Sequence, residues 1–170
     1  MRQIKAFKGK KPVIHPTAFI HETAVIVGDV EIGEHVSVWP YAVIRGDNNF
    51  IKIKAYSNVQ DHVLIHVSDE HPAIIDEYVT LGHRAIVHAC HIKHDVIVGM
   101  GATILDGATI SEYSLVGANA LVSPNKTFPE KSMILGMPAI VTRELNQNDI
   151  DTIHHNALHY AAMKEYYRED

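Results

Sequence analysis

A six-residue repeat of aliphatic side chains constrains this chain more than any other feature of its sequence. Six residues fit neither the 3.6-residue period of a helix nor the two-residue period of a simple strand, but they match a short strand followed by a corner. This period is typical of a β-helix built from hexapeptide repeats. The repeated positions are Ile14, Ile20, Ile26, Ile32, Val38, Ile44, Ile53, Val59, Ile65, Ile75, Leu81, Val87, Ile92, Val98, Ile104, Ile110, Val116 and Val122.

Three such repeats close one triangular coil, and we expect the repeated aliphatic side chains to point into it. A small or β-branched residue four positions later supplies a second inward site, so large and small side chains alternate in a narrow core. Successive coils lie roughly 4.8 Å apart, so residues on one face form columns along the axis. The sequence therefore predicts an all-β solenoid, a parallel β-helix of hexapeptide repeats.

The phase of the repeat breaks at three places, across residues 44–53, 65–75 and 87–92, where the spacing is nine, ten and five residues. The most polar and histidine-rich segments of the chain surround these breaks. Irregular loops in repeat proteins are where function accumulates. We therefore expect a functional site near the breaks.

The two ends of the chain differ from its middle. After Val122 the repeat fades through prolines and a glycine, and from about Asn148 apolar residues recur at helical spacing, with Asn146 or Asn148 as the cap. We expect a β-helix domain over residues 1–145 and a C-terminal α-helix over residues 146–170 that packs on it. The helical stripe expected to face the solenoid includes His154, His155, His159 and Tyr160.

Composition excludes several classes of protein. A chain of 170 residues with 46% hydrophobic residues suits one domain. The net charge of −5 provides no basic field for nucleic acid or an anionic membrane. Cys90 is the only cysteine, which excludes an internal disulfide. No stretch suits a signal peptide or a transmembrane helix, so we expect a cytoplasmic protein.

Counting inward positions in threes places residues of successive coils in the same column. Arg45, His66 and His88 each follow inward positions three steps apart, so we expect them in one outward column. Asp61 and His83 follow another such pair, and we expect them in a column on the adjoining face.

His66 and His88 in neighbouring coils would lie close enough to share a metal ion at the usual Zn–N distance of about 2.0–2.1 Å. His83 lies around a corner and would reach that pair most easily from a second copy of the chain. Three copies around a threefold axis would form three equivalent sites. Three histidines with an open fourth position are typical of catalytic zinc. Chance surface histidines are the alternative, since the chain has thirteen.

Several short motifs carry a family resemblance: Arg45-Gly46-Asp47, Asn58-Val59-Gln60-Asp61, His66, Gly82-His83, His88 and Gly99-Met100-Gly101. In these motifs the chain resembles the γ-class carbonic anhydrases, over about residues 12–145. The resemblance implies a left-handed β-helix, a homotrimer, and a divalent metal that is zinc, with iron or cobalt as alternatives that three imidazoles also accept. It implies carbon dioxide and bicarbonate as the substrates.

The resemblance also assigns the ligands. His66 and His88 look like the two metal ligands from one subunit, and His83 like the ligand from its neighbour. Other histidines near these motifs match nothing in the family and are interpreted as surface residues: His62, His91 and His94.

Polar residues around the ligands resemble the family's supporting residues. Arg45 and Asp61 resemble a pair that forms a salt bridge across the trimer interface, and Asp47 resembles its support. For these three the alternative is a purely structural role. Gln60 resembles the side chain that hydrogen-bonds the attacking oxygen or bicarbonate, and Asn58 is a weaker candidate for the same polar shell.

The chain departs from the family pattern at the proton-transfer residues. Asn48 stands where the family prototype has a glutamate. In the loop after the first ligand, Asp69, Glu70 or His71 could replace the second glutamate as proton shuttle, or all three could be ordinary solvated groups.

Three functional hypotheses follow. The first is metal-dependent, reversible hydration of carbon dioxide to bicarbonate. The second is hydrolysis or transfer of an acyl group from coenzyme A, as in other hexapeptide-repeat proteins, which would require a basic pocket for the nucleotide. The third is a catalytically silent, metal-stabilised trimer.

Overall fold

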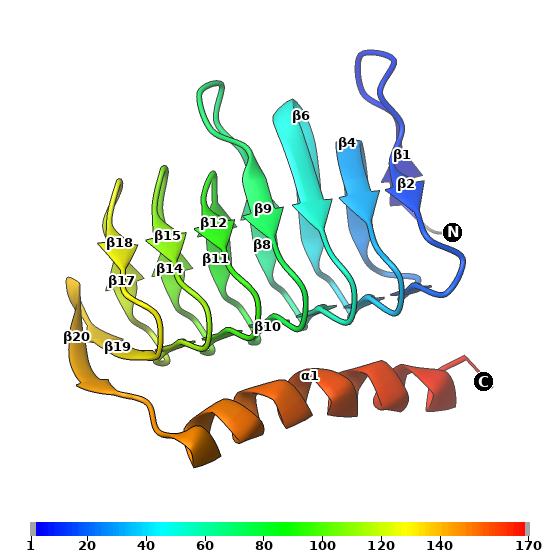
Figure 1. Ribbon diagram of the computed structural model, residues 1–170. Coiled ribbons are helices and arrows are strands. Elements are labelled where there is room, and N and C mark those ends of the chain that lie inside the picture. The colour runs from blue at the N-terminus through cyan, green and yellow to red at the C-terminus, as the bar shows by residue number, and fades with distance from the viewer. Residues whose placement is uncertain (1–2, 169–170) are drawn as a thin grey trace.

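The computed structural model, which describes residues 3–168, is a triangular solenoid of parallel strands. It has about seven left-handed turns, followed by one C-terminal helix, α1 (Gln147–Tyr166), within the described residues (Figure 1). The predicted fold class is therefore confirmed. From β1 to β19, each strand pairs in parallel with the strand one coil away, and β20 pairs antiparallel with β19.

The solenoid has three faces, named here for what they carry. The histidine face consists of β1 (Gln3–Lys5), the first parts of β4 (Val25–Ile32) and β6 (Val43–Ile53), β8 (Leu64–His66), β11 (Ile86–His88), β14 (Thr103–Ile104) and β17 (Leu121–Val122). The lysine face consists of β2 (Val13–Ile14), the second parts of β4 and β6, β9 (Ala73–Ile75), β12 (His91–Ile92), β15 (Thr109–Ile110) and β18 (Thr127–Phe128). The helix face consists of β3 (Phe19–Ile20), β5 (Ser37–Val38), β7 (Asn58–Val59), β10 (Thr80–Leu81), β13 (Ile97–Val98), β16 (Leu115–Val116), β19 (Ser132–Gly136) and the antiparallel β20 (Ala139–Glu144).

The predicted inward positions form the core. All of the repeated aliphatic residues are buried except Ile14, which is partly buried in the first coil. The repeat also continues further than its sequence pattern indicated, because Phe128 and Ile134 follow Val122 at six-residue spacing and are buried. This last coil was not predicted, because Phe128 takes the place of an aliphatic residue at one inward position and prolines lie on the surface nearby.

The three phase breaks lie on one corner, between the histidine face and the lysine face. There β4 and β6 run through the corner without interruption, and a side chain at Gly28 would collide with the carbonyl of Gly46. The loop between β8 and β9 projects beyond the neighbouring coils (Figure 1). The short third break, at Ala89, turns with a positive φ of 50°. The three phase breaks therefore all lie beside the histidine face.

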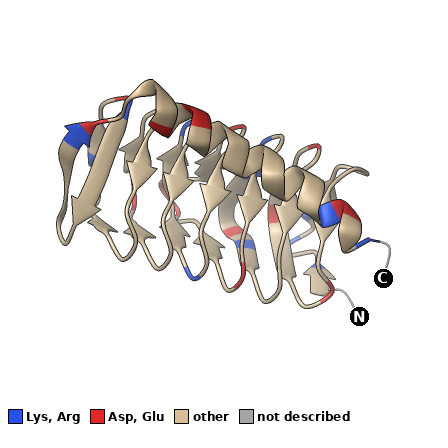
Figure 2. Cartoon of the chain, turned by 90° about the horizontal axis from the view of Figure 1, so that it is seen from below, with Lys and Arg blue, Asp and Glu red and all other residues tan. Residues whose placement is uncertain are grey.

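Helix α1 runs along the helix face (Figure 2). Asn146 caps it through a capping box with Asp149, which confirms one of the two expected caps. Ile153 and Ala157 are buried against the strands. The described residues include no helix with enough apolar length to cross a membrane. Whether strands and helix form separate domains at residue 145 stays a prediction.

The expected helical stripe is only half correct. His154 donates to Asp95 over 2.6 Å, and the Tyr160 ring packs against Trp39 with centroids 5.7 Å apart. His155 and His159 are exposed, because successive helical residues are rotated by about 100° and these two fall on the outer side.

Candidate metal centre

His66 and His88 face each other on the histidine face. The parallel register places Arg45, His66 and His88 side by side on β6, β8 and β11, which confirms the predicted column. His66 Nδ1 lies 3.1 Å from His88 Nε2, and both side chains are partly buried.

This separation suits two ligands of one metal ion. Two nitrogens bound tetrahedrally to one zinc ion at the usual bond length are about 3.3 Å apart, close to the 3.1 Å between His66 and His88. The outer ring nitrogen of each histidine donates to a carboxylate, which is the usual second partner of a metal-binding imidazole. These two residues therefore fit a divalent metal ion.

Asp47 holds the outer nitrogen of His66. Nε2 of His66 donates to Asp47 Oδ1 over 2.9 Å, and Asp47 also forms an ion pair with Arg45 in the same chain. Partial burial opposes ionisation of Asp47, but the hydrogen bonds from His66 and Arg45 outweigh it and lower its pKa. Asp47 is thus a fixed anion behind the first candidate ligand.

His83 lies in the turn after β10, at the corner between the helix face and the histidine face. Its Nδ1 donates to Asp61 Oδ2 over 2.7 Å, one coil away, which confirms the second predicted column. Within residues 3–168 of one chain, no group of three or more histidine, cysteine, aspartate or glutamate side chains converges on a common point. One chain brings His66 and His88 together and leaves His83 apart.

Asp106 is a carboxylate that the sequence analysis missed. Its Oδ1 accepts a 2.6 Å hydrogen bond from Nδ1 of His88. Each candidate ligand therefore has its own carboxylate: Asp47, Asp61 or Asp106. Counting inward positions in threes aligns Ile104 with Val87, and this count would have placed Asp106 in the coil next to His88.

Gln60 and Asn58 lie under helix α1 at the edge of the helix face. Gln60 Nε2 donates to Asn58 Oδ1 over 3.1 Å, and Asn58 Nδ2 donates to Thr80 Oγ1 over 2.8 Å. The Thr80 hydroxyl donates to Asn156 of α1 over 2.9 Å. All but Asn156 are buried. Thr80 was not predicted from the sequence, although it is in register with Asn58. Asn156 was not predicted either, because local sequence carries no signal for it.

The loop after His66 is held by its own hydrogen bonds. Ser68 N donates to the His71 carbonyl over 3.1 Å, and Asn49 Nδ2 donates to the carbonyl of Asp69 over 3.3 Å. Asp69 and Glu70 are exposed and His71 is partly buried.

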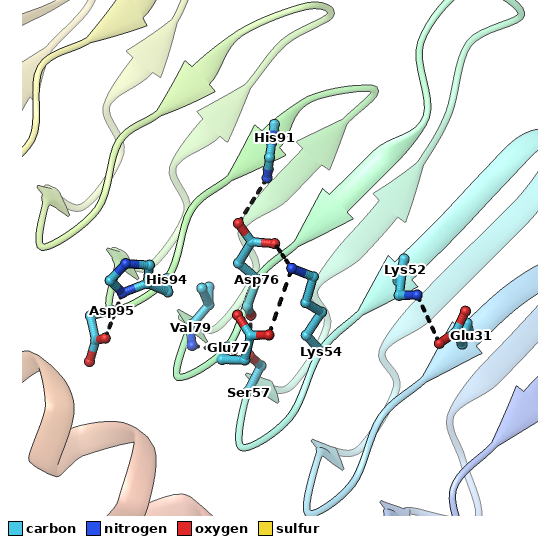
Figure 3. A network of polar contacts seen from close by, with 10 residues as sticks. All are labelled: Glu31, Lys52, Lys54, Ser57, Asp76, Glu77, Val79, His91, His94 and Asp95. Atoms are coloured by element: carbon cyan, nitrogen blue, oxygen red, sulfur yellow. Dashed lines mark hydrogen bonds and ion pairs between the residues drawn. The ribbon is translucent and has the colours of Figure 1, made fainter.

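Two of the histidines interpreted as surface residues are more engaged than expected. His91 donates to Asp76 over 2.9 Å, and His94 donates to Asp95 over 2.9 Å, both from partly buried positions. Figure 3 shows these contacts, which lie away from the histidine face. His62 is exposed and stacks on Tyr41.

An apolar column runs beside the candidate ligands on the outside of the histidine face. One residue before each inward position, register aligns Val25, Val43, Leu64, Ile86, Thr103 and Leu121. Helix α1 covers another face, and Ile86 is 38% exposed. The column is mostly apolar and partly exposed, on a face that no helix covers.

Comparison with known proteins places the chain in a family. Residues 11–46 match the family described as Bacterial transferase hexapeptide (six repeats). A protein of Methanocaldococcus jannaschii named "Probable carbonic anhydrase" is 51% identical over 146 residues, which are 86% of this chain and 92% of that protein. The mitochondrial "Gamma carbonic anhydrase 1" of Arabidopsis thaliana is 36% identical over 162 residues, which are 92% of this chain. The chain spans only 59% of the plant protein's length.

A solved structure has the same fold. The crystal structure of a Bacillus cereus protein, assigned provisionally as an acetyltransferase, is 42% identical with a TM-score of 0.96, and the alignment covers 98% of this chain and 96% of that one. From the sequence relatives and this fold, the chain belongs to the γ-carbonic anhydrase family of hexapeptide-repeat proteins.

Proposed function

We propose that the chain is a metal-dependent carbonic anhydrase of the γ class, which converts carbon dioxide and water reversibly to bicarbonate and a proton. The proposal rests on one observation above the others. His66 and His88 face each other at 3.1 Å, while their outer nitrogens are held by Asp47 and Asp106. The names of the archaeal and plant relatives support the same activity.

His66 and His88 would hold the metal ion, and His83 of a second copy would complete the ligand set. A bound divalent metal, which we propose to be zinc, acts as a Lewis acid and lowers the pKa of water toward neutrality. The carboxylates of Asp47 and Asp106 hold each imidazole with one nitrogen directed at the site.

The site would be complete only in an assembly. The apolar column beside the ligands supports packing of the histidine face against another copy, and His83 lies at the edge of that face, 42% exposed. Three copies around a threefold axis would bring each His83 to the next copy's His66 and His88. We therefore propose a homotrimer with the site between subunits.

Gln60 would orient the substrate oxygens. One of its amide hydrogens is used by Asn58, which fixes the amide plane and leaves its carbonyl and second N–H for substrate. Thr80 supports Asn58 from the next coil. A rigid amide costs little reorganisation during the reaction.

The proton would leave along the loop after His66. Asp69 and Glu70 are exposed on that loop, and His71 is partly buried at its end. A carboxylate or imidazole there can pass a proton to buffer.

Acyl transfer or hydrolysis with coenzyme A is the second candidate, because the Bacillus cereus structure of the same fold carries a provisional acetyltransferase assignment. It would require a basic pocket for phosphate groups beside the metal site. A metal-stabilised trimer without catalysis is the third candidate, but a structural zinc ion normally has four protein ligands, whereas three histidines are proposed here.

The deciding experiment is stopped-flow carbon dioxide hydration. The protein is prepared anaerobically, loaded with zinc or iron, and compared with His88→Ala, with metal content measured in each sample. His155→Ala is the matched control, since His155 is exposed on α1 and bonds only to its own helix. We expect activity that follows metal content, survives in the control and is lost in His88→Ala.

A metal-loaded protein with no more activity than His88→Ala would rule out the anhydrase proposal. The same samples would then be assayed with acyl-coenzyme A thioesters. Turnover there would establish the second candidate.

A further inference from the structure

The orientation of the His88 ring is not fixed by its strand. A histidine ring can turn about its last side-chain bond, and the hydrogen bond of one nitrogen decides which atom the other presents. The backbone of β11 places the His88 ring beside His66. A hydrogen-bond partner on the far side of the ring, at Nδ1, directs Nε2 toward His66.

Asp106 is that partner, and the spacing of two coils explains why it reaches the ring. In the coil that carries His88, the step around the corner from Val87 to Ile92 is five residues long. In the next coil, the corresponding step from Ile104 to Ile110 is six residues long. The two corners still align, because Gly107 N donates to the Ala89 carbonyl over 2.8 Å. Asp106 is thus an extra residue before the corner, beside the His88 ring.

The backbone at Asp106 is itself held in place. The amide of Asn125 donates to the Asp106 carbonyl over 2.8 Å, which fixes the turn from the following coil. Asp106 Oδ1 lies 2.6 Å from Nδ1 of His88, with both side chains partly buried. A carboxylate accepts a strong, directional hydrogen bond from an imidazole.

We infer that Asp106 is a positioning residue for the metal centre: by accepting the Nδ1 hydrogen of His88, it fixes the ring with Nε2 toward His66 and strengthens metal binding. The inference rests on the metal site of the proposed function. Loss of a carboxylate in this position typically weakens metal affinity by about 10–100-fold. Asp106→Ala removes the acceptor, and Asp106→Asn keeps a neutral one.

The first readout needs no metal. In metal-free protein labelled with ¹⁵N-histidine, we expect NMR to show His88 as the Nδ1–H tautomer with a downfield Nδ1 proton. That signal should be lost in Asp106→Ala and largely kept in Asp106→Asn. Asp151→Ala is the matched control, because Asp151 lies on the exposed side of α1 and accepts from Gln147. Unchanged His88 resonances in Asp106→Ala would overturn the inference.

The second readout is metal affinity, measured by competition with a chromophoric chelator for Zn²⁺ and by the visible spectrum of bound Co²⁺. We expect about 10–100-fold weaker binding in Asp106→Ala, a smaller loss in Asp106→Asn and none in Asp151→Ala. Equal affinity in all four proteins would overturn the inference while leaving the proposed function intact. Wild-type protein that binds neither metal would instead overturn the proposed metal site, and the ring resonances would still show whether Asp106 orients His88.

Discussion

Two aspartate–histidine pairs lie on either side of one corner and have different surroundings. On the histidine face, His88 donates to Asp106 and turns its other nitrogen toward His66. On the lysine face, His91 donates to Asp76, whose other oxygen lies 2.7 Å from Lys54 Nζ. Figure 3 shows the second network, in which Lys54 also approaches Glu77.

The two aspartates differ in whether the chain provides a lysine as a cationic partner. Asp76 has a lysine and a histidine as partners, so its charge is balanced inside the chain. Asp106 has no lysine or arginine partner among the described residues, and the charge of a bound metal would complete the arrangement around it. Histidine–carboxylate pairs alone therefore do not identify a metal site. What distinguishes the site is a second imidazole nitrogen facing another ligand.

The outward columns of the two faces differ in the same sense. On the histidine face the column is mostly apolar, from Val25 to Leu121. On the lysine face the equivalent column is mostly charged or polar: Val13, Glu31, Lys52, Ile74, His91, Thr109 and Thr127. The first column suits a protein partner and the second suits water.

An aspartate in place of Ile86 tests whether the histidine face is a subunit interface. Ile86→Asp places a carboxylate in the middle of the apolar column, and burying it at an interface would cost several kcal/mol per subunit. We expect the assembly to dissociate to monomers, as measured by size-exclusion chromatography with light scattering. Carbon dioxide hydration should be lost with it, because the third ligand would come from another copy.

Ile74→Asp is the matched control. Ile74 occupies the same outward position on the lysine face, where a carboxylate would stay in water. We expect this variant to assemble as the wild type does. Two variants with the same oligomeric state would contradict the assignment of the histidine face to a subunit interface.

The columns were predictable from sequence because they follow from one period. Once three inward positions make a coil, the placement of Arg45 beside His66 is a matter of counting, and the register agrees. The helix and its cap at Asn146 could also be predicted, because both depend on residues that are close together in the sequence. Repeats convert long-range contacts into fixed offsets, which is why so much of this fold can be read from the chain.

Other features were not predictable in this way. The bond between Thr80 and Asn156 joins the solenoid to a helix outside the repeat, so no offset relates them. The position of all three phase breaks at one corner depends on how the backbone accommodates inserted residues, which the period does not predict. The pairing of Lys54 with Asp76 depends on side-chain packing rather than on the period.

Removal of the Lys54 charge tests the charge balance around Asp76. Asp76 is only 7% exposed, so Lys54→Met leaves a buried carboxylate with His91 alone. Breaking a buried ion pair costs about 3–5 kcal/mol. Since Lys54 is about one-third exposed, we expect a loss of about 2 kcal/mol in the free energy of unfolding, measured by urea denaturation at neutral pH.

Lys52→Met tests whether burial is the cause. Lys52 pairs with Glu31 on the same face at 3.1 Å, but both side chains are exposed, and exposed pairs contribute about 0–1 kcal/mol. We expect Lys52→Met to unfold close to the wild type. Equal losses in the two lysine variants would mean that the lysine face responds to total charge rather than to the buried carboxylate.

The smallest effect is the pH dependence that Asp76 gives to stability. Burial opposes its ionisation, but the ion pair with Lys54 and the hydrogen bond from His91 outweigh burial and lower its pKa in the folded chain. A lowered folded-state pKa means that the unfolded chain binds the proton more readily as pH falls. The stabilisation is therefore complete well above the ordinary aspartate value of about 3.9 and is lost as the pH falls below it, through the folded-state pKa.

Asp76→Asn removes this titration. We expect the wild type to be more stable than Asp76→Asn at about pH 6, and the difference in the free energy of unfolding to shrink toward about pH 3. Asp151→Asn, on the exposed side of α1, should run parallel to the wild type over the same range. A difference between wild type and Asp76→Asn that stays constant with pH would show that Asp76 acts through packing. Charge balance on the lysine face would then not explain why the Asp76–His91 pair differs from the Asp106–His88 pair.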